Sequence, residues 1–351
     1  MRVSKQHMIS AVLGVGLAAL LIWGIKEDPQ LRYFRNEGKI FGTYYNIRYE
    51  AKSDLQDSIN AALQAFDNSL SMFNPHSVLS AINANRDTTT DAAFETMWAE
   101  AERVHTLSHG AFDITVAPLV NYWGFGNKKS YSPKDDLTGE AGLTAEQPYS
   151  VSDLLEFVGF DHVRLENHRI VKDDERIQLD AGAVAKGQAC DMIADVLRRN
   201  GCANYLVDIG GEVVVHGVND KGAKWHIGIT KPNINNEGAQ DELQQVLAVS
   251  DAAMATSGNY RNFYYDGGER RSHTIDPRTG YPVQHSVLSA TVISSTCMRA
   301  DAMATACMVL GADEALDMIR RAEDAACYLI VAQNDSLVTL TSPNWDDFIA
   351  K

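Results

Sequence analysis

Two stretches between residues 272 and 306 combine residue types that suit an oxygen-rich metal site. Ser272 to Pro282 has the sequence SHTIDPRTGYP, with a histidine, an acid before a proline and a Thr-Gly pair. Ala300 to Ala306, ADAMATA, contains Asp301 and Thr305. If this second stretch is helical, the carboxylate and the hydroxyl share one face, because residues four apart stack on a helix surface. Such oxygens suit Mg²⁺, which completes its shell with phosphates or water.

The same stretches also allow a purely structural interpretation. Asp276-Pro277 is typical of an ordinary turn, and an aspartate such as Asp301 near a helix start often caps free amides. Spacing alone favours this structural interpretation over a metal site. The choice between the two therefore depends on other motifs in the chain.

Two further patterns are weaker signals of chemistry. Leu179 to Gly187, LDAGAVAKG, places small residues before a predicted helix, and a helix start suits an anion. The segment matches neither a Walker motif nor GxGxxG. His105 and His109 lie four apart on another predicted helix, which is the spacing of paired metal ligands. Without an obvious third ligand, this pair does not predict a metal site.

The composition is that of a globular protein with an acidic surface. The chain has 351 residues, of which 45% are hydrophobic and 22% charged, and a net charge of -15. This balance argues against nucleic acid as a partner, because binding there depends on Lys and Arg neutralising phosphates. The five cysteines include no CxxC pair and lie among apolar or small residues, which indicates buried thiols rather than a disulfide framework.

The N-terminus predicts a membrane anchor. An uncharged run from Met8 to Ile25 follows Arg2 and Lys5, and a helix of this length spans about 27 Å, close to a bilayer core. Positive charge before the run places the N-terminus in the cytoplasm and the body outside. A cleaved signal peptide is the alternative, although Trp23 to Ile25 is a poor cleavage site. We therefore divide the chain into an anchor segment (1–29), a linker (30–38) and one domain (39–351).

The rest of the chain mixes helical and strand patterns, which predicts an α+β fold with antiparallel sheets and packed helices. Helices are expected at 55–70, 92–108, 187–200, 300–310 and 315–321. Strands are expected at 39–50, 205–216, 225–230, 247–250, 287–294, 326–332 and 336–341, with a hairpin in 163–179 and a small-residue turn at 255–260. Residues 127–150 are expected to be a surface loop or lid.

Taken together, seven segments resemble the FAD:protein FMN transferases of the ApbE family. In chain order they are FGTYY from Phe41, GAFDITVAPLVNYWGFG from Gly110, LDAGAVAKGQACD from Leu179, DIGGEV from Asp208, ATSGNYRNF from Ala255, SHTIDPRTGYP from Ser272 and ADAMATACMVLG from Ala300. They occur in the family's order over about residues 40–340. This joint match is far more specific than any single motif.

The resemblance implies a T-fold-like α+β domain and an activity. A bound FAD is cleaved at its diphosphate, with Mg²⁺, and FMN passes to a Thr or Ser hydroxyl of another protein while AMP leaves. Acceptors in the family are subunits of membrane redox complexes such as Na⁺-translocating NADH:quinone reductase and Rnf. The resemblance also implies an N-terminally anchored protein of the bacterial inner membrane, with its catalytic domain in the periplasm. The absence of a lipobox cysteine leaves only the tethering mode open.

The resemblance also assigns individual residues. Mg²⁺ would be held by Asp301, Thr305 and the carbonyl of Ala183. The FAD site would be lined by Phe41, Phe73, Ala111, Phe112, Asp113, Asp180, Lys186 and Ile275. Relatives often have Tyr or Trp where this chain has Phe73, and Met where it has Phe41. The acceptor hydroxyl needs a base, and His273 has the most suitable ordinary pKa, with Asp301 able to contribute to the same step.

Two other functions remain open at the level of sequence. In an Mg²⁺-dependent FAD pyrophosphatase, water would replace the acceptor hydroxyl and the same residues would serve. A non-catalytic periplasmic flavin-binding protein would not require a metal at the diphosphate, so the pair Asp301 and Thr305 argues against it.

Overall fold

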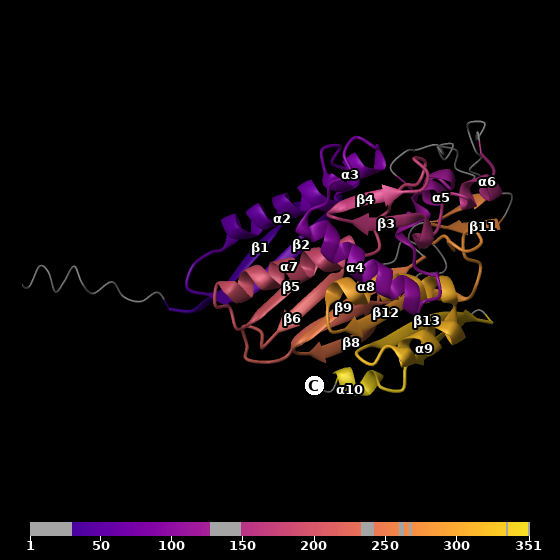
Figure 1. Cartoon of the computed structure of the whole chain (residues 1–351). Helices are drawn as coiled ribbons and strands as arrows, with labels where there is room; N and C mark the ends of the chain where they lie inside the picture. The colour runs from indigo at the N-terminus through magenta and orange to yellow at the C-terminus, as the bar shows by residue number, and fades with distance from the viewer. Residues whose placement is uncertain are drawn as a thin grey trace, which may run out of the picture.

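A single antiparallel sheet forms the centre of the protein (Figure 1). The computed structural model describes residues 30–126, 149–232, 242–259, 263–266, 269–334 and 336–349. Within this part of the chain, eight strands pair in the order β1 (Arg32–Ile40), β2 (Thr43–Ala51), β5 (Tyr205–Ile209), β6 (Glu212–His216), β9 (Ala252–Gly258), β12 (Val287–Ser294), β13 (Ala326–Gln333) and β14 (Ser336–Thr341). Every pairing is antiparallel, which confirms the predicted antiparallel α+β fold.

Helices cover one face of this sheet and enclose the larger core (Figure 1). They are α2 (Gln56–Leu70), α3 (Val78–Asn83), α4 (Ala92–Leu107), α7 (Ala185–Arg199), α8 (Cys297–Leu310) and α9 (Ala312–Arg321). On α2 the buried residues Ile59, Leu63 and Phe66 keep the three- and four-residue spacing of one helix face, as the sequence predicts. Short helices α5 (Ala117–Tyr122), α6 (Val151–Leu155), η1 (Ile114–Val116) and η2 (Phe160–His162) fill one end, beside the hairpin of β3 (Val163–Glu166) and β4 (Arg169–Lys172).

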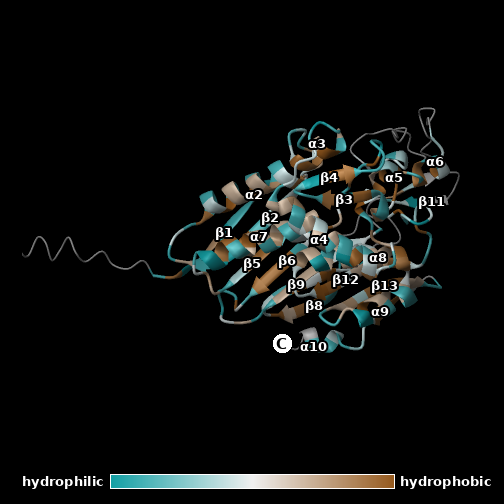
Figure 2. Ribbon diagram, in the orientation of Figure 1, coloured by the Kyte–Doolittle hydropathy of each residue, from teal (hydrophilic) through white to brown (hydrophobic). Residues whose placement is uncertain are grey.

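A second, smaller core lies on the opposite face of the sheet. Val213 and Val215 of β6 belong to it, whereas Val214 between them belongs to the larger core, because successive side chains of a strand point to opposite faces. β6 is correspondingly coloured as apolar in Figure 2. The hairpin of β7 (Trp225–Thr230) and β8 (Leu243–Val249) covers this core together with α10 (Trp345–Ile349). A further hairpin joins β10 (Phe263–Asp266) and β11 (Glu269–Ser272).

The buried helix α8 is fixed at its N-terminus by two side chains. The hydroxyl of Thr296 accepts a hydrogen bond from the Arg299 amide (3.2 Å). Asp191 of α7 accepts the amides of Cys297 (2.9 Å) and Met298 (2.8 Å). Asp301 lies a full turn further on, so it does not cap its own helix; it accepts the Gly187 amide in the first turn of α7 instead. These capping bonds orient the part of α8 that carries Asp301.

Three local predictions differ from the structure. Residues 30–38, expected as a linker, mostly belong to β1, whose full length pairs with β2. The expected strand at 39–50 is interrupted by a tight turn at Phe41 and Gly42. Both residues have positive φ (53 and 73), as two-residue hairpin turns require. The expected turn at 255–260 is largely β9, a strand between β6 and β12 that packs under α8.

Two other predictions fall on parts of the chain that the structure does not describe. The predicted anchor at 1–29 and nearly all of the predicted loop or lid at 127–150 lie outside the described residues. Among the helices that are described, none is both long and apolar enough to span a bilayer.

All five cysteines are buried thiols without disulfide bonds, in agreement with the sequence analysis.

Candidate active site

One cavity of ≈1010 Å³ brings most of the predicted site residues together. It opens where the starts of α7 and α8 meet the strands β2, β5 and β7 and the segment 273–277. Its lining includes the predicted residues Ala111, Phe112, Asp113, Asp180, Ala183, Lys186, His273, Ile275, Asp301 and Thr305. Its volume is at the upper end of the range for small-molecule sites, about 300–1,000 Å³, as a dinucleotide requires.

A buried ionic centre lies in the wall of this cavity. Lys186 of α7 contacts the carboxylate of Glu212 on β6, and its Nζ lies 3.9 Å from Oδ1 of Asp301 on α8. The other oxygen of Asp301, Oδ2, accepts a hydrogen bond from the Gly187 amide (3.0 Å). Both carboxylates are in residues only 2% exposed. The first turn of α7 therefore holds Asp301 through one amide and one ammonium group.

Burial and mutual attraction set the pKa values in this centre. Burial raises the pKa of Glu212 and of Asp301, and the ammonium group of Lys186 opposes that effect in both. Burial alone would lower the pKa of Lys186, but the two carboxylates outweigh it and hold that pKa above its usual value. Lys186 is therefore charged at neutral pH. The centre has two carboxylates and one ammonium group, so a further positive charge, either a proton or a bound cation, would balance its charge.

The surroundings of this centre fit a hard cation. Glu212 Oε2 is buried and has no hydrogen-bond partner among the described residues. Thr305 lies one turn after Asp301 on α8, and its hydroxyl is 3.1 Å from the hydroxyl of Ser257. Ala183 precedes α7 and lines the same cavity. Asp301, Thr305 and the backbone carbonyl of Ala183 would supply oxygen donors of the kind that Mg²⁺ takes.

The donor set is not a complete metal cage. Across the described residues, no three His, Cys, Asp or Glu side chains group closely enough to hold a metal by themselves. Mg²⁺ commonly uses one or two carboxylates and takes the remaining ligands from phosphates and water. The site therefore suits a cation that binds together with a phosphorylated ligand.

The loop before α7 supplies polar groups at the same opening. Asp180 accepts the Gly182 amide at Oδ1 (2.6 Å), and its own amide donates to the Ile114 carbonyl (2.6 Å). Burial raises the pKa of Asp180, and the bond from Gly182 opposes that rise. Because the positive end of the α7 dipole also faces this opening, the loop suits the anionic part of a ligand.

Asp113 shapes a second wall of the cavity. One carboxylate oxygen accepts the amide (2.8 Å) and the hydroxyl (2.6 Å) of Thr115, and the other accepts the Phe160 amide (3.1 Å). The ring of His105 lies 3.3 Å from that second oxygen. Burial raises the pKa of Asp113, while the bonds from Thr115 and the charge of His105 counteract it. Asp113 thus anchors the loop that presents Ala111 and Phe112.

His105 and His109 do not converge on a common site. Nδ1 of His105 lies 2.9 Å from the Phe112 carbonyl, whereas Nε2 of His109 lies 2.6 Å from Arg321. The absence of a predicted metal site at this pair therefore agrees with their geometry.

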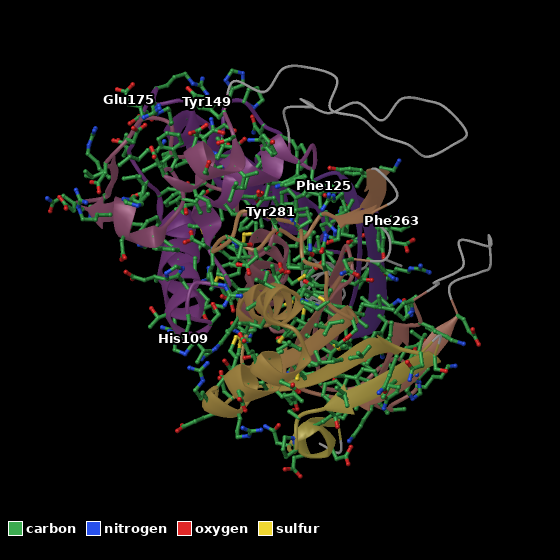
Figure 3. All side chains as sticks on the ribbon, turned by 90° about the vertical axis from the view of Figure 1, so that its right-hand side faces the viewer. His109, Phe125, Tyr149, Glu175, Phe263 and Tyr281 are labelled. Atoms are coloured by element: carbon green, nitrogen blue, oxygen red, sulfur yellow. The ribbon has the colours of Figure 1, made fainter. Side chains whose placement is uncertain are left out.

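His273 lies beside an aromatic group at the rim of the cavity. Its ring is 6.2 Å from that of Phe125, which itself stacks on Tyr264 at 5.3 Å. Figure 3 shows Phe125 near the middle of the face that also carries Phe263 on the β10–β11 hairpin. His273 is half-buried and lines the cavity with Ile275.

The segment that follows His273 is the predicted turn. Asp276 accepts the backbone amides of Thr279 (3.3 Å) and Gly280 (2.8 Å), and its side chain pairs with Arg278. Ile275 forms a β-bridge to Pro282 on the far side of that turn. The turn thus fixes Ile275, two residues after His273, in the cavity wall.

Phe41 and Phe73 lie outside the cavity lining. Phe41 packs against Phe66 of α2, with ring centroids 5.4 Å apart, and Phe73 is 67% exposed. Met72, the neighbour of Phe73, lines the cavity instead. The assignment of these two rings to the flavin site stays a prediction.

Glu212 and Ser257 are site residues that sequence reasoning missed. Glu212 ends the segment DIGGE and contacts Lys186, and Ser257 contacts Thr305 from β9. The two glycines before Glu212 could have indicated a special turn at this position. Gly210 (φ 67) and Gly211 (φ 101) adopt backbone conformations that favour glycine. Ser257 belongs to the segment ATSGNYRNF of the resemblance, but that segment was expected as a turn and no role was assigned to the serine.

The fold and the cavity together match one family of proteins. The family model described as ApbE family matches residues 41–329, and the chain belongs to this family. It is 33% identical over 346 residues to the FAD:protein FMN transferase of Vibrio cholerae, covering 96% of this chain and 98% of that protein. It is 32% identical to the protein of the same name from Escherichia coli K12, covering 95% of each chain.

Solved structures give the same result. The flavin transferase ApbE from Vibrio cholerae superposes with a TM-score of 0.78 at 32% identity, covering 91% of this chain and 100% of that one. The apo form of the flavinyl transferase ApbE from Pseudomonas stutzeri also gives a TM-score of 0.78, at 28% identity, covering 92% of this chain and 98% of that one.

Proposed function

We propose that this chain is an FAD:protein FMN transferase that requires Mg²⁺. It takes FAD as substrate, transfers FMN to a Thr or Ser hydroxyl of a target protein and releases AMP. The observation that carries the proposal is the ionic centre of Lys186, Glu212 and Asp301 in the wall of a cavity large enough for a dinucleotide. The names of the curated relatives support the same activity.

The transfer is a substitution at one phosphorus atom of the diphosphate. The acceptor hydroxyl oxygen forms a new bond to the phosphorus of the FMN half, and the bond from that phosphorus to the bridging oxygen breaks. The bridging oxygen leaves with AMP, and the hydroxyl proton passes to a base. Such a reaction depends mainly on in-line positioning and on charge neutralisation.

The residues of the cavity divide this work. Lys186 places a fixed positive charge near the phosphates, and His273, which lines the cavity, takes the hydroxyl proton, a role that imidazole groups commonly fill. Asp301, Thr305 and the Ala183 carbonyl hold Mg²⁺, which spreads the charge of the diphosphate when it is bound. Asp113 and Ile275 belong to the walls that orient the dinucleotide.

The partner and the location follow from the family resemblance and the N-terminal sequence. The acceptor is a subunit of a membrane redox complex, of the Na⁺-translocating NADH:quinone reductase or Rnf type. The uncharged run from Met8 to Ile25 anchors the chain in the inner membrane, with the domain in the periplasm.

Product analysis tests the proposal against hydrolysis and storage. Residues 30–351 would be incubated with FAD, Mg²⁺ and a soluble fragment of such a subunit, and AMP, free FMN and the intact mass of the fragment would be measured together. Transfer predicts a mass gain equal to bound FMN and an equal amount of AMP. AMP with free FMN and an unlabelled fragment would instead establish a pyrophosphatase, and bound FAD without AMP a storage protein.

A further inference from the structure

A groove runs from the ionic centre along the outer face of the sheet. Its floor is formed by side chains that alternate with buried ones on β2 and β5. These are Tyr44, Asn46 and Arg48 on β2, with Leu206 and Asp208 on β5. The groove is one part of the large cavity, which Glu212 and Lys186 also line.

The wall of this groove is the edge of a strand. β7 lines the cavity through Trp225, His226, Ile227, Gly228 and Thr230. Among the described strands, β7 pairs only with β8, so its other edge carries backbone groups that no described strand takes up. Such an edge is a template for another extended chain.

The direction of the backbone groups can be assigned. Lys231, directly after β7, donates its amide to the Glu242 carbonyl beside β8 (2.7 Å). The register shifts between Ile229 and Thr230, but the extra residue lies on β8. β7 itself therefore keeps its alternation, and the amides of Thr230, Gly228 and His226 point away from β8. The edge of β7 turned away from β8 therefore offers three backbone amides, one at every second residue.

The two ends of the groove differ. At one end the rings of Tyr33 and Trp225 close it, with centroids 6.4 Å apart, and Tyr33 donates to the Val218 carbonyl (2.7 Å). At the other end lies Gly211, which is exposed and where a Cβ would meet no atom within 4 Å. The floor from Leu206 to Gly210 extends about 13 Å, the length of four or five extended residues.

The chemistry of the floor suits a polypeptide. Tyr44 is 55% exposed there, and tyrosine is a frequent anchor in protein interfaces. Asn46 Oδ1 is buried without a hydrogen-bond partner among the described residues, and it lies beside Asp208 in the strand register. The Asp208 carboxylate, which lines the cavity, can accept amides of an added chain. None of the groove residues is among those that the family resemblance assigns to FAD.

We propose that this groove binds the acceptor protein as an extended segment that adds to the edge of β7 with which no described strand pairs. The inference rests on the proposed function, which requires a polypeptide hydroxyl to reach the diphosphate. A segment lying between β7 and the floor would leave the groove at Gly211, beside Glu212 and Lys186, where its Thr or Ser meets the phosphorus. Main-chain hydrogen bonds would supply affinity, and the floor side chains would select the sequence.

A proline at the strand edge tests this placement. His226→Pro removes one outward amide, whereas the matched control His226→Thr retains it. Steady-state transfer to fragments of an Na⁺-translocating NADH:quinone reductase subunit and of an Rnf subunit would be measured for both, together with the Kd for FAD. We expect His226→Pro to raise the KM for the acceptor at least tenfold over His226→Thr, with equal Kd values for FAD. Equal acceptor KM values, or a selective loss of FAD binding, would overturn the inference.

Cross-linking provides a second measurement that does not depend on how β7 tolerates proline. Because all five native cysteines are buried, His226→Cys offers a single reactive thiol, and Gln64→Cys on the exposed side of α2 is the control. A bismaleimide should join His226→Cys, but not Gln64→Cys, to an acceptor fragment with a cysteine four residues from its Thr, the length of the groove floor. Equal cross-linking at both positions, or none at 226, would contradict the groove. A wild-type enzyme that labels neither fragment would instead overturn the proposed function and this inference with it.

Discussion

The Gly187 amide donates a 3.0 Å hydrogen bond to Asp301, and this bond is possible only because Gly187 has no side chain. A Cβ at this position would lie 2.3 Å from the carbonyl oxygen of Cys297 and 2.8 Å from Cα of Met298. The two helices that carry the ionic centre therefore touch through backbone. Close packing at one glycine sets the distance between Lys186 and Asp301.

Gly187→Ala should accordingly separate α7 from α8. We expect it to lower the free energy of unfolding by about 1–3 kcal/mol, the usual cost of overpacking, and to reduce transfer. Urea titration and the transfer assay would measure the two effects, with the exposed Arg199→Ala at the end of α7 as the control. A Gly187→Ala protein that is as stable and as active as the control would contradict this prediction, because α7 and α8 would then accommodate the methyl group without cost.

Glu212→Gln should weaken the binding of Mg²⁺. The substitution removes one of the two carboxylates around Lys186 and so reduces the negative charge that a cation would neutralise. Residues around metal ligands typically contribute about 10–100-fold in affinity, and we expect a loss of that size. The Mg²⁺ dependence of AMP release, at saturating FAD, would measure it. An unchanged Mg²⁺ requirement would remove Glu212 from the cation site.

His273→Ala should slow transfer without weakening FAD binding. A positioned general base contributes about 10²–10⁴-fold, and His273 lines the cavity at half-buried exposure. Single-turnover transfer and the Kd for FAD would be measured for this variant and for His168→Ala, which changes an exposed histidine outside the cavity lining. Transfer at the wild-type rate would exclude His273 as the base.

The contact between Asp191 and the start of α8 should make stability depend on pH. Burial outweighs the bonds from Met298 and Cys297 and raises the pKa of Asp191 to about 6. The folded protein then binds this proton more tightly than the unfolded chain, for which the value is 3.8. The stabilisation is complete below pH 3.8 and is lost as the pH rises through 6, a change of up to about 3 kcal/mol.

Urea titration of wild type and Asp191→Asn between pH 4 and 7 would measure this difference. We expect the stability of wild type, relative to the variant, to fall as the pH rises towards 6. A relative stability that stays constant or rises over that window would contradict the raised pKa.

Periodicity predicted the helices well, because their buried residues keep regular spacing. The α2 pattern of Ile59, Leu63 and Phe66 is a clear example. β1 was missed because an edge strand with polar residues on both faces shows no alternation, as its sequence RYFRNEGKI illustrates. β9 was missed because its small residues resemble a turn, whereas they lie at the centre of the sheet beneath α8.

The predicted residues other than Phe41 and Phe73 line the cavity, but their pairings could not be predicted from the sequence. The spacing of Asp301 and Thr305 placed them on one face of a helix, and the resemblance added Lys186 and Ala183. The contact of Lys186 with Glu212 joins α7 to β6, so it depends on tertiary packing that no local pattern records. For the same reason the groove beside β7 became visible only once the strands had been placed.

The central claim is that Asp301 and a divalent cation enable FMN transfer at this centre. The most direct measurement is the intact mass of an acceptor fragment incubated with FAD and Mg²⁺ and with either wild type or Asp301→Ala, alongside the Kd for FAD of each enzyme. We expect FMN labelling with equimolar AMP for wild type, loss of labelling on chelation, and no labelling by a folded Asp301→Ala protein. Labelling by Asp301→Ala at the wild-type rate would contradict it.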